Sequence, residues 1–244
     1  MSKSNDLERF FGVERASFYL REAGGDIELA IELYDWGIQM SAAWHAHLAY
    51  VEVAVRNAID MQLRTYNADQ SLPNGTQFTE KWALDRNTAS IIYGIIGEKL
   101  GTARKDAKVA SKARGEGHPR YGDLVTHTDI ISQLTFGPWV RLVSLADSRR
   151  NQPYQNRLWQ ECLHKAFPGA YGTESGRRFI GGRLETLRVL RNRIAHHENI
   201  LYVEHLDRLK DSLIILRAID PDLPNLVMRS NQIRSLLKQD PRLR

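Results

Sequence analysis

The sequence predicts an all-α fold. Apolar residues recur at intervals of three and four along most of the chain, the pattern of helices that bury one face. Alternating runs of β-branched residues, which would indicate strands, do not stand out, and no internal repeat has a fixed period. With 244 residues, of which 42% are hydrophobic and 26% charged, the chain has the composition of a globular protein with a sizeable core.

The first helix is predicted over Leu7–Glu22, and Ala23–Gly25 supply the glycines that favour a helix end. Asp26 is expected to cap a second helical run that extends to about Tyr66. Because a run of about forty residues is long for a helix, we expect a break near Gly37–Ser41.

The segment Asn67–Thr79, which contains LPNGT, is predicted to be a loop. Six further helices are expected, at Asp85–Leu100, Thr126–Ser148, Tyr154–Ala166, Ser175–His197, Val203–Ile219 and Leu226–Gln239. The second of these should break at Phe136-Gly137-Pro138, because proline lacks a backbone donor and glycine accepts unusual dihedral angles. We expect one helical domain over residues 1–244, with an N-terminal helical part over 1–70 and a core over about 122–220.

Cysteine content and hydropathy limit the class of protein. The single cysteine, Cys162, excludes an internal disulfide and leaves no thiolate framework for zinc. The N-terminus has no apolar stretch of the signal-peptide kind, and no apolar run approaches the ~18 residues of a membrane helix. We therefore expect a cytoplasmic protein that does not contact membranes and needs no metal or cofactor.

The net charge of +5 is concentrated in one segment, residues 101–121, which is expected to be a glycine-containing basic loop. It contains two acidic residues, Asp106 and Glu116, against six basic ones: Arg104, Lys105, Lys108, Lys112, Arg114 and Arg120. Two interpretations stay open. The segment is a solvated loop, or it grips phosphates and becomes ordered on RNA.

The segment Arg191–Ile200, reading RNRIAHHENI, carries the clearest chemistry. Histidine exchanges protons near neutral pH, and arginine presents a rigid fork of donors to a phosphate or to a phosphoryl transition state. Asn192 and His196 fall on one line of an ideal helix, but Arg191 and His196 lie about 140° apart. These two could share a phosphate through the long arginine stem, a kink near the helix end, or a second copy of the chain. The alternative is that the segment only caps a helix end.

Other candidate residues have competing interpretations. Glu52 and Arg56 are four residues apart on the predicted helix. They either form a structural ion pair or, together with Asn57, line the same cleft as Arg191 and His196. His45 and His47 should point about 200° apart on a helix and cannot chelate one ion there. Trp139 is expected in the core rather than on a base-stacking surface.

Three stretches together resemble the Abi-like (abortive-infection) branch of the HEPN ribonucleases. They are LYDWGIQMSAAW with YVEVAVRNAID (within residues 33–60), QLTFGPWVRL (133–142) and LRVLRNRIAHHENI (187–200). They stand in the family's order and spread over residues of about 7 to 235. The resemblance implies a HEPN-like helical bundle with additional N-terminal and C-terminal helices, and a homodimer.

The resemblance also implies metal-independent cleavage of single-stranded or looped RNA through attack by its own 2′-OH, leaving a cyclic phosphate. His196 would act as base or acid, Arg191 would stabilise the transition state, and Asn192 would orient the reacting groups. His197 would take the complementary proton-transfer role or only pack. The biology implied is prokaryotic phage defence or a toxin, with an antitoxin or regulatory partner. A non-catalytic RNA- or nucleotide-binding module and a helical interaction protein remain the alternatives.

Overall fold

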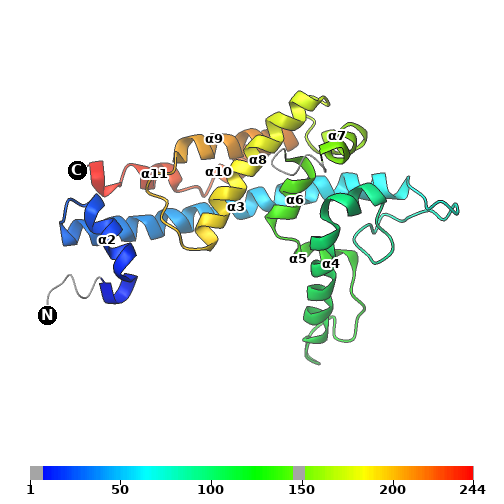
Figure 1. Ribbon diagram of the computed structural model, residues 1–244, viewed down its shortest axis with the longest axis horizontal. Helices are drawn as coiled ribbons and strands as arrows, with labels where there is room; N and C mark the ends of the chain where they lie inside the picture. Colours follow the sequence, from blue (N-terminus) through cyan, green and yellow to red (C-terminus); the bar gives the residue numbers. More distant parts are fainter. Residues whose placement is uncertain (1–7, 145–151, 244) are drawn as a thin grey trace. The chain divides into compact units, whose positions relative to one another are not determined.

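The structure, a computed structural model, describes residues 8–144 and 152–243 (Figure 1). Within these ranges the protein is helical, without a strand, and one isolated antiparallel bridge joins Ser71 and Gln77. The predicted all-α class is therefore confirmed. None of the described helices combines the length and the hydrophobicity needed to span a bilayer. Leu7 and residues 145–148, which the sequence assigns to helices, lie outside the described ranges.

The helices follow one another along the chain in the order labelled in Figure 1. They are α2 (Val13–Glu22), α3 (Ile27–Ala68), α4 (Ser90–Lys112), α5 (His127–Gln133), α6 (Phe136–Val143), α7 (Gln152–Glu161), α8 (Glu174–Ala195), α9 (His205–Ile219), α10 (Leu223–Met228) and α11 (Ile233–Leu237). Two 3-10 helices, η1 (Leu163–Ala166) and η2 (Pro241–Leu243), follow α7 and α11.

The end of α2 is closed by glycines, as predicted. Gly25 N–H donates to the carbonyl of Leu20 at 2.8 Å, and Gly24 N–H donates to that of Arg21 at 3.1 Å. Both glycines have positive φ, so the turn is a Schellman motif. The start differs from the prediction, because Gly12, with a φ of +77°, separates α2 from a short helical turn before it.

Asp26 caps α3 as expected. Its Oδ1 accepts from the backbone N–H of Glu28 at 2.9 Å and of Leu29 at 3.1 Å, which satisfies two of the donors left free at a helix start.

The break predicted near Gly37–Ser41 is wrong, because α3 runs without interruption from Ile27 to Ala68. Gly37 is buried within the helix, and the hydroxyl of Tyr19 lies 3.5 Å from the position that a Cβ would take. A Cβ there would make only an ordinary van der Waals contact, so space does not require glycine at this position. The packing of the buried neighbours Trp36 and Met40 compensates its low helix propensity.

The described residues group into two compact units, each built from separate stretches of the chain. The first contains residues 1–50, 190–209 and 225–244, and the second contains 51–189 and 210–224. Residues 70 and 122, the boundaries suggested by the sequence, both lie inside the second unit. The single domain stays a prediction.

In the first unit two buried tryptophans of α3 fix the polypeptide that packs on them. Trp36 Nε1 donates to the carbonyl of Leu236 at 2.8 Å, and Trp44 Nε1 donates to Nδ1 of His205 at 2.9 Å. A buried indole stabilises the fold by its large apolar area, provided that its N–H finds an acceptor. The same two contacts bring α11 and the start of α9 to α3.

The helix predicted over Leu226–Gln239 is two short helices, α10 and α11. Asn231 separates them, and its Oδ1 accepts from the backbone N–H of Ile233 at 3.1 Å. Asparagine side chains compete for backbone donors in this way, which favours a turn over a continuous helix.

In the second unit a buried carboxylate joins three segments. Asp60 Oδ1 accepts from Trp82 Nε1 and from His127 Nε2, each at 2.8 Å, while Oδ2 accepts from Arg64 Nε at 2.8 Å. His127 Nδ1 accepts from the N–H of Ala83, so its proton resides on Nε2. Burial alone would raise the pKa of Asp60, but the hydrogen bonds, first from His127, hold it below its usual value.

The basic loop predicted over 101–121 is helical in its first half, because α4 continues to Lys112. Its sequence is rich in alanine and lysine, which are strong helix formers, and Leu100, Ala103 and Ala107 are buried along one face. The predicted start at Asp85 is also wrong, since α4 begins at Ser90.

The break in the predicted Thr126–Ser148 helix lies between α5 and α6, just before Phe136. Pro138 falls in the first turn of α6, where a missing N–H costs nothing. Trp139 is fully buried and packs edge-on against Trp82, with the ring centroids 6.0 Å apart. Its predicted place in the core is confirmed.

Candidate functional site

The RNRIAHHENI segment forms the C-terminal end of α8 and the turn that follows it. Arg191 and Asn192 lie near the end of α8, and the N–H of His196 still donates to the carbonyl of Asn192 at 3.0 Å. The hydrogen-bond ladder is therefore unbroken as far as His196, and the helix has no kink that would bring Arg191 and His196 onto one side. The long arginine stem and a second copy of the chain remain as the ways to a shared phosphate.

His197 closes this helix in a conformation that usually requires glycine. Its φ is +53°, its N–H donates to the carbonyl of Ile194 at 3.1 Å, and the N–H of Glu198 donates to that of Arg193 at 2.9 Å. This is again a Schellman motif, with histidine in the left-handed position. A non-glycine residue there costs of order 1 kcal/mol, so neighbouring contacts must hold it.

Two arginines supply such contacts. Arg15 of α2 donates from Nη2 to the carbonyl of His197 at 3.0 Å. Arg193 turns back over the helix end, where Nε lies 3.6 Å from a carboxylate oxygen of Glu198 and Nη2 donates to the carbonyl of Asn199. Both arginines therefore position the backbone of the turn.

The side chains of His196 and His197 are exposed, whereas Arg191 and Asn192 are half-buried. Arg191 is already engaged in an interaction within the protein. The packing role considered for His197 does not fit an exposed side chain. The turn thus presents two imidazoles to solvent from a backbone fixed by arginine contacts. Imidazole is a side chain that exchanges protons near neutral pH. The turn is contacted by two guanidinium groups, those of Arg15 and Arg193, against one carboxylate, that of Glu198, and this excess of positive charge favours an anion.

The predicted supporting residues Glu52, Arg56 and Asn57 lie on α3 in the second unit. Asn57 is exposed, Glu52 is half-buried and engaged, and Nε of Arg56 is buried without a hydrogen bond to the described residues. That these three residues line the same cleft as Arg191 and His196 stays a prediction.

The residues of the basic segment divide into two groups. Arg104 donates to the carbonyls of Ala83 and Leu84 at 2.8 and 2.7 Å, and Arg114 pairs with Asp129 at 2.9 Å. These contacts hold the fold together. Lys105, Lys108 and Lys112, in contrast, are exposed on α4, and the described residues offer them no ion pair.

Arg120 is also committed to Asp129, through hydrogen bonds of 2.6 and 2.7 Å. The guanidinium of Arg120 holds the pKa of Asp129 well below its usual range, so the pair stays ionised. Of the six basic residues the sequence singles out, the three arginines therefore serve the fold, and the three lysines stay accessible.

His45 and His47 diverge on α3, as predicted. His45 is exposed, whereas His47 is buried beside Asn231, whose Nδ2 lies 3.0 Å from the imidazole Nδ1. Burial lowers the pKa of His47 to about 4, so the ring is neutral near pH 7. The described residues contain no group of three His, Cys, Asp or Glu side chains that could hold a metal ion.

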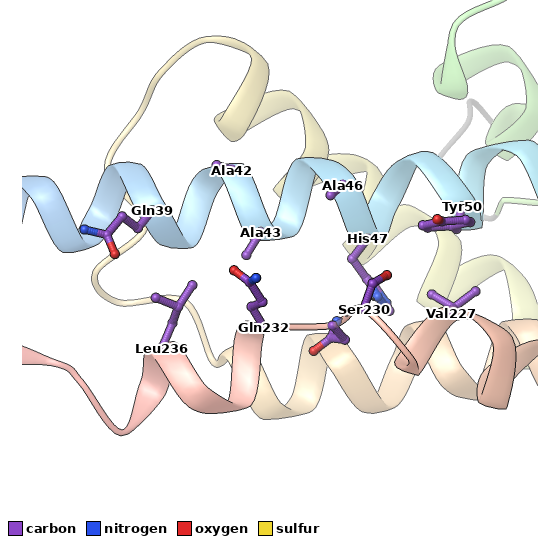
Figure 2. A pocket seen from close by; sticks show the side chains of 11 residues that line it. Gln39, Ala42, Ala43, Ala46, His47, Tyr50, Val227, Ser230, Gln232 and Leu236 are labelled. Carbon is purple, nitrogen blue, oxygen red and sulfur yellow. Dashed lines mark hydrogen bonds between the residues drawn. The ribbon is translucent and has the colours of Figure 1, made fainter.

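His47 lines a groove of about 430 Å³ between α3 and the segment that contains α10 and α11 (Figure 2). Alanines of α3 form one wall, and Figure 2 shows His47 pointing from α3 toward the 230–232 segment. The groove also carries amide and hydroxyl groups from Gln39, Ser230 and Gln232 but no formally charged side chain. It is therefore a poor site for a phosphate, and the exposed turn of α8 remains the better candidate.

Sequence reasoning missed Arg15, because nothing in its surroundings indicates a contact with a residue 182 positions away. It also missed the Asp60–His127 pair, whose members are 67 positions apart. Comparison with protein-family models, with curated proteins and with solved structures gave no match to this chain.

Proposed function

We propose that the protein is a metal-independent endoribonuclease of the HEPN type, acting in prokaryotic phage defence or as a toxin. One observation carries the proposal: the exposed imidazoles of His196 and His197 stand on a turn that Arg15 and Arg193 hold in place, five and six residues after Arg191. The resemblance of the three sequence stretches to Abi-like proteins supports the same reaction.

The chemistry follows from the two residue types. One imidazole accepts the proton of the 2′-OH as its oxygen attacks the adjacent phosphorus, and the bond from phosphorus to the 5′-oxygen breaks. The other imidazole, protonated beforehand, gives its proton to the leaving 5′-oxygen. Arg191 stabilises the charge on the non-bridging oxygens, where preorganised donors contribute most. The products are a 2′,3′-cyclic phosphate and a 5′-OH.

The test is cleavage of end-labelled single-stranded RNA by the full chain in excess EDTA, with the ends mapped. We expect cleavage that leaves cyclic phosphate, no cleavage of DNA of the same sequence, and loss of activity in both Arg191→Ala and His196→Ala. His45→Ala is the matched control for His196→Ala, since it removes another exposed histidine from a helix of the same unit.

Two outcomes would reject the proposal. If a folded wild-type protein binds RNA but leaves it intact, the protein is a binding module. If cleavage survives both Arg191→Ala and His196→Ala, the active site lies elsewhere or the activity belongs to a contaminant. Circular dichroism of each variant separates loss of chemistry from loss of the fold.

A further inference from the structure

The exposed face of α4 carries a row of lysines. Lys105, Lys108 and Lys112 are three and four residues apart, so they share one side of the helix over a rise of about 10 Å. All three are exposed, and none forms a hydrogen bond or ion pair with another described residue. The opposite side of α4 packs into the second unit through buried isoleucine, leucine and alanine side chains. The row therefore presents uncompensated positive charge on a rigid support.

The same side of α4 contains two glycines in the helix interior. Gly94 and Gly101 are seven residues apart, a step that returns to nearly the same angle, and the same step leads on to Lys108. A Cβ added at either glycine would meet nothing within 4 Å. Packing among the described residues thus gives no reason for glycine, although glycine weakens a helix relative to alanine. Glycine does allow a ligand to approach the backbone closely.

An aromatic side chain lies beside the end of the lysine row. Tyr121 is 56% exposed, and it lines a hollow of about 260 Å³ together with Lys112 and Arg114. Bases of single-stranded RNA stack on exposed aromatic rings while lysines follow the phosphates. Glu98 also lies on this face, and its carboxylate is 3.6 Å from the ammonium of its neighbour Lys99. The hollow contains a second carboxylate, Asp123, whose Oδ2 lies 3.5 Å from Nε of Arg120.

From these observations we infer that this face of α4, formed by Gly94, Gly101, Lys105, Lys108 and Lys112, binds the phosphate backbone of single-stranded RNA, with Tyr121 stacking on a base. A linear array of cations on a smooth helix face matches a linear polyanion. The identification of that polyanion as RNA rests on the proposed function. The test therefore measures binding apart from cleavage.

The experiment uses the full-length His196→Ala variant, labelled single-stranded RNA and EDTA. The affinity is measured at salt concentrations from about 50 to about 300 mM. Replacing the three lysines by glutamine should make the plot of log affinity against log salt shallower by about 2, since each phosphate contact on a single strand contributes ~0.7. At 0.1 M salt the affinity should fall by about tenfold or more.

The matched control is the triple variant Lys81→Gln, Lys165→Gln, Lys210→Gln. These lysines are also exposed in the second unit, so the net charge changes equally. If the control loses as much affinity and slope as the α4 variant, only net charge matters and the inference is overturned. An unchanged slope in the α4 variant overturns it as well.

A second variant, Gly101→Gln, separates binding from stability. Glutamine is a better helix former than glycine, so the melting temperature should rise, while RNA affinity should fall severalfold because the side chain covers the backbone. If Gly101→Gln raises the melting temperature and leaves the RNA affinity unchanged, the glycine does not serve RNA binding, which would count against the inference. Affinity for anionic lipid vesicles that depends on the lysines, without any such dependence for RNA, would overturn it too.

The two proposals fail in different ways. Lysine-dependent RNA binding by a protein that cleaves nothing would reject the nuclease and leave the α4 surface standing. If the wild type cleaves RNA but replacing the lysines leaves the salt dependence of binding unchanged, the nuclease stands and the α4 surface is rejected.

Discussion

Arg15 and His197 are 182 positions apart in sequence, and the guanidinium of Arg15 donates to the backbone carbonyl of His197 at 3.0 Å. His197 is the residue that closes α8 with positive φ, between the exposed His196 and Glu198. The contact therefore ties the N-terminal helix α2 to the turn on which the proposed chemistry depends, inside the first unit.

Replacing Arg15 by alanine should lower RNA cleavage severalfold with little change in stability. The hydrogen bond is exposed, so its contribution to the free energy of unfolding is about 1 kcal/mol or less. The catalytic effect comes from the looser backbone at His197, since small displacements of reacting groups reduce rates strongly. Arg21→Ala on the same helix is the control. Equal activity of the two variants would show that Arg15 does not position the turn.

His197→Gly should raise the free energy of unfolding by about 0.5–1 kcal/mol, because glycine adopts positive φ without the strain of a Cβ. Urea unfolding measures this change. Cleavage by the same variant assigns the second proton-transfer role. If His197 protonates the leaving group, activity falls sharply although the protein is more stable. Unchanged activity would restrict the chemistry to Arg191 and His196.

The sequence predicted the helices well where local signals are strong. The Asp26 cap and the Gly24–Gly25 helix end are local, since each depends on hydrogen bonds within a few residues. The prediction failed at Gly37, where length and propensity favoured a break but the buried neighbours Trp36 and Met40 pack within a continuous helix. Propensity is a weak signal that packing overrides.

The candidate site was predicted only in part, because spacing along a helix is a local signal and contacts between distant residues are not. The spacing of Arg191, Asn192 and His196 predicts a helix, and the structure has this helix as far as Ala195, with His196 in the turn that follows. The positive φ of His197 and its contact with Arg15 arise from tertiary structure, which spacing does not contain. Likewise, local charge could not distinguish Arg104, which donates to two loop carbonyls, from the exposed Lys105.

Stability should fall as the pH decreases from about 6.5 to about 4. Burial lowers the pKa of His47 and of His205 to about 4, so the unfolded chain binds protons in this window that the folded protein does not. The contribution of these two neutral histidines to the free energy of unfolding is complete above pH ~6.5, and it is lost as the pH falls from about 6.5 to about 4. The His47→Gln variant should show a shallower dependence of the urea midpoint on pH, whereas the exposed His45→Gln should match the wild type. A midpoint that does not vary between pH 7.5 and 4.5 would contradict this account.

Substitutions around Asp60 should destabilise the second unit in a fixed order. Asp60→Ala leaves the N–H groups of Trp82 and His127 buried without an acceptor, which costs about 3–5 kcal/mol when a buried charged network is broken. Asp60→Asn keeps one oxygen for those two donors but loses the charge that faces Arg64, so about 1–3 kcal/mol is expected. Arg64→Gln should cost less than about 1 kcal/mol, because Arg64 is one-third exposed and its pairing is screened by solvent. Urea unfolding followed by tryptophan fluorescence gives the three values. If Asp60→Ala costs no more than Arg64→Gln, the carboxylate does not hold Trp82 and His127 together, and the core of this unit depends on apolar packing alone.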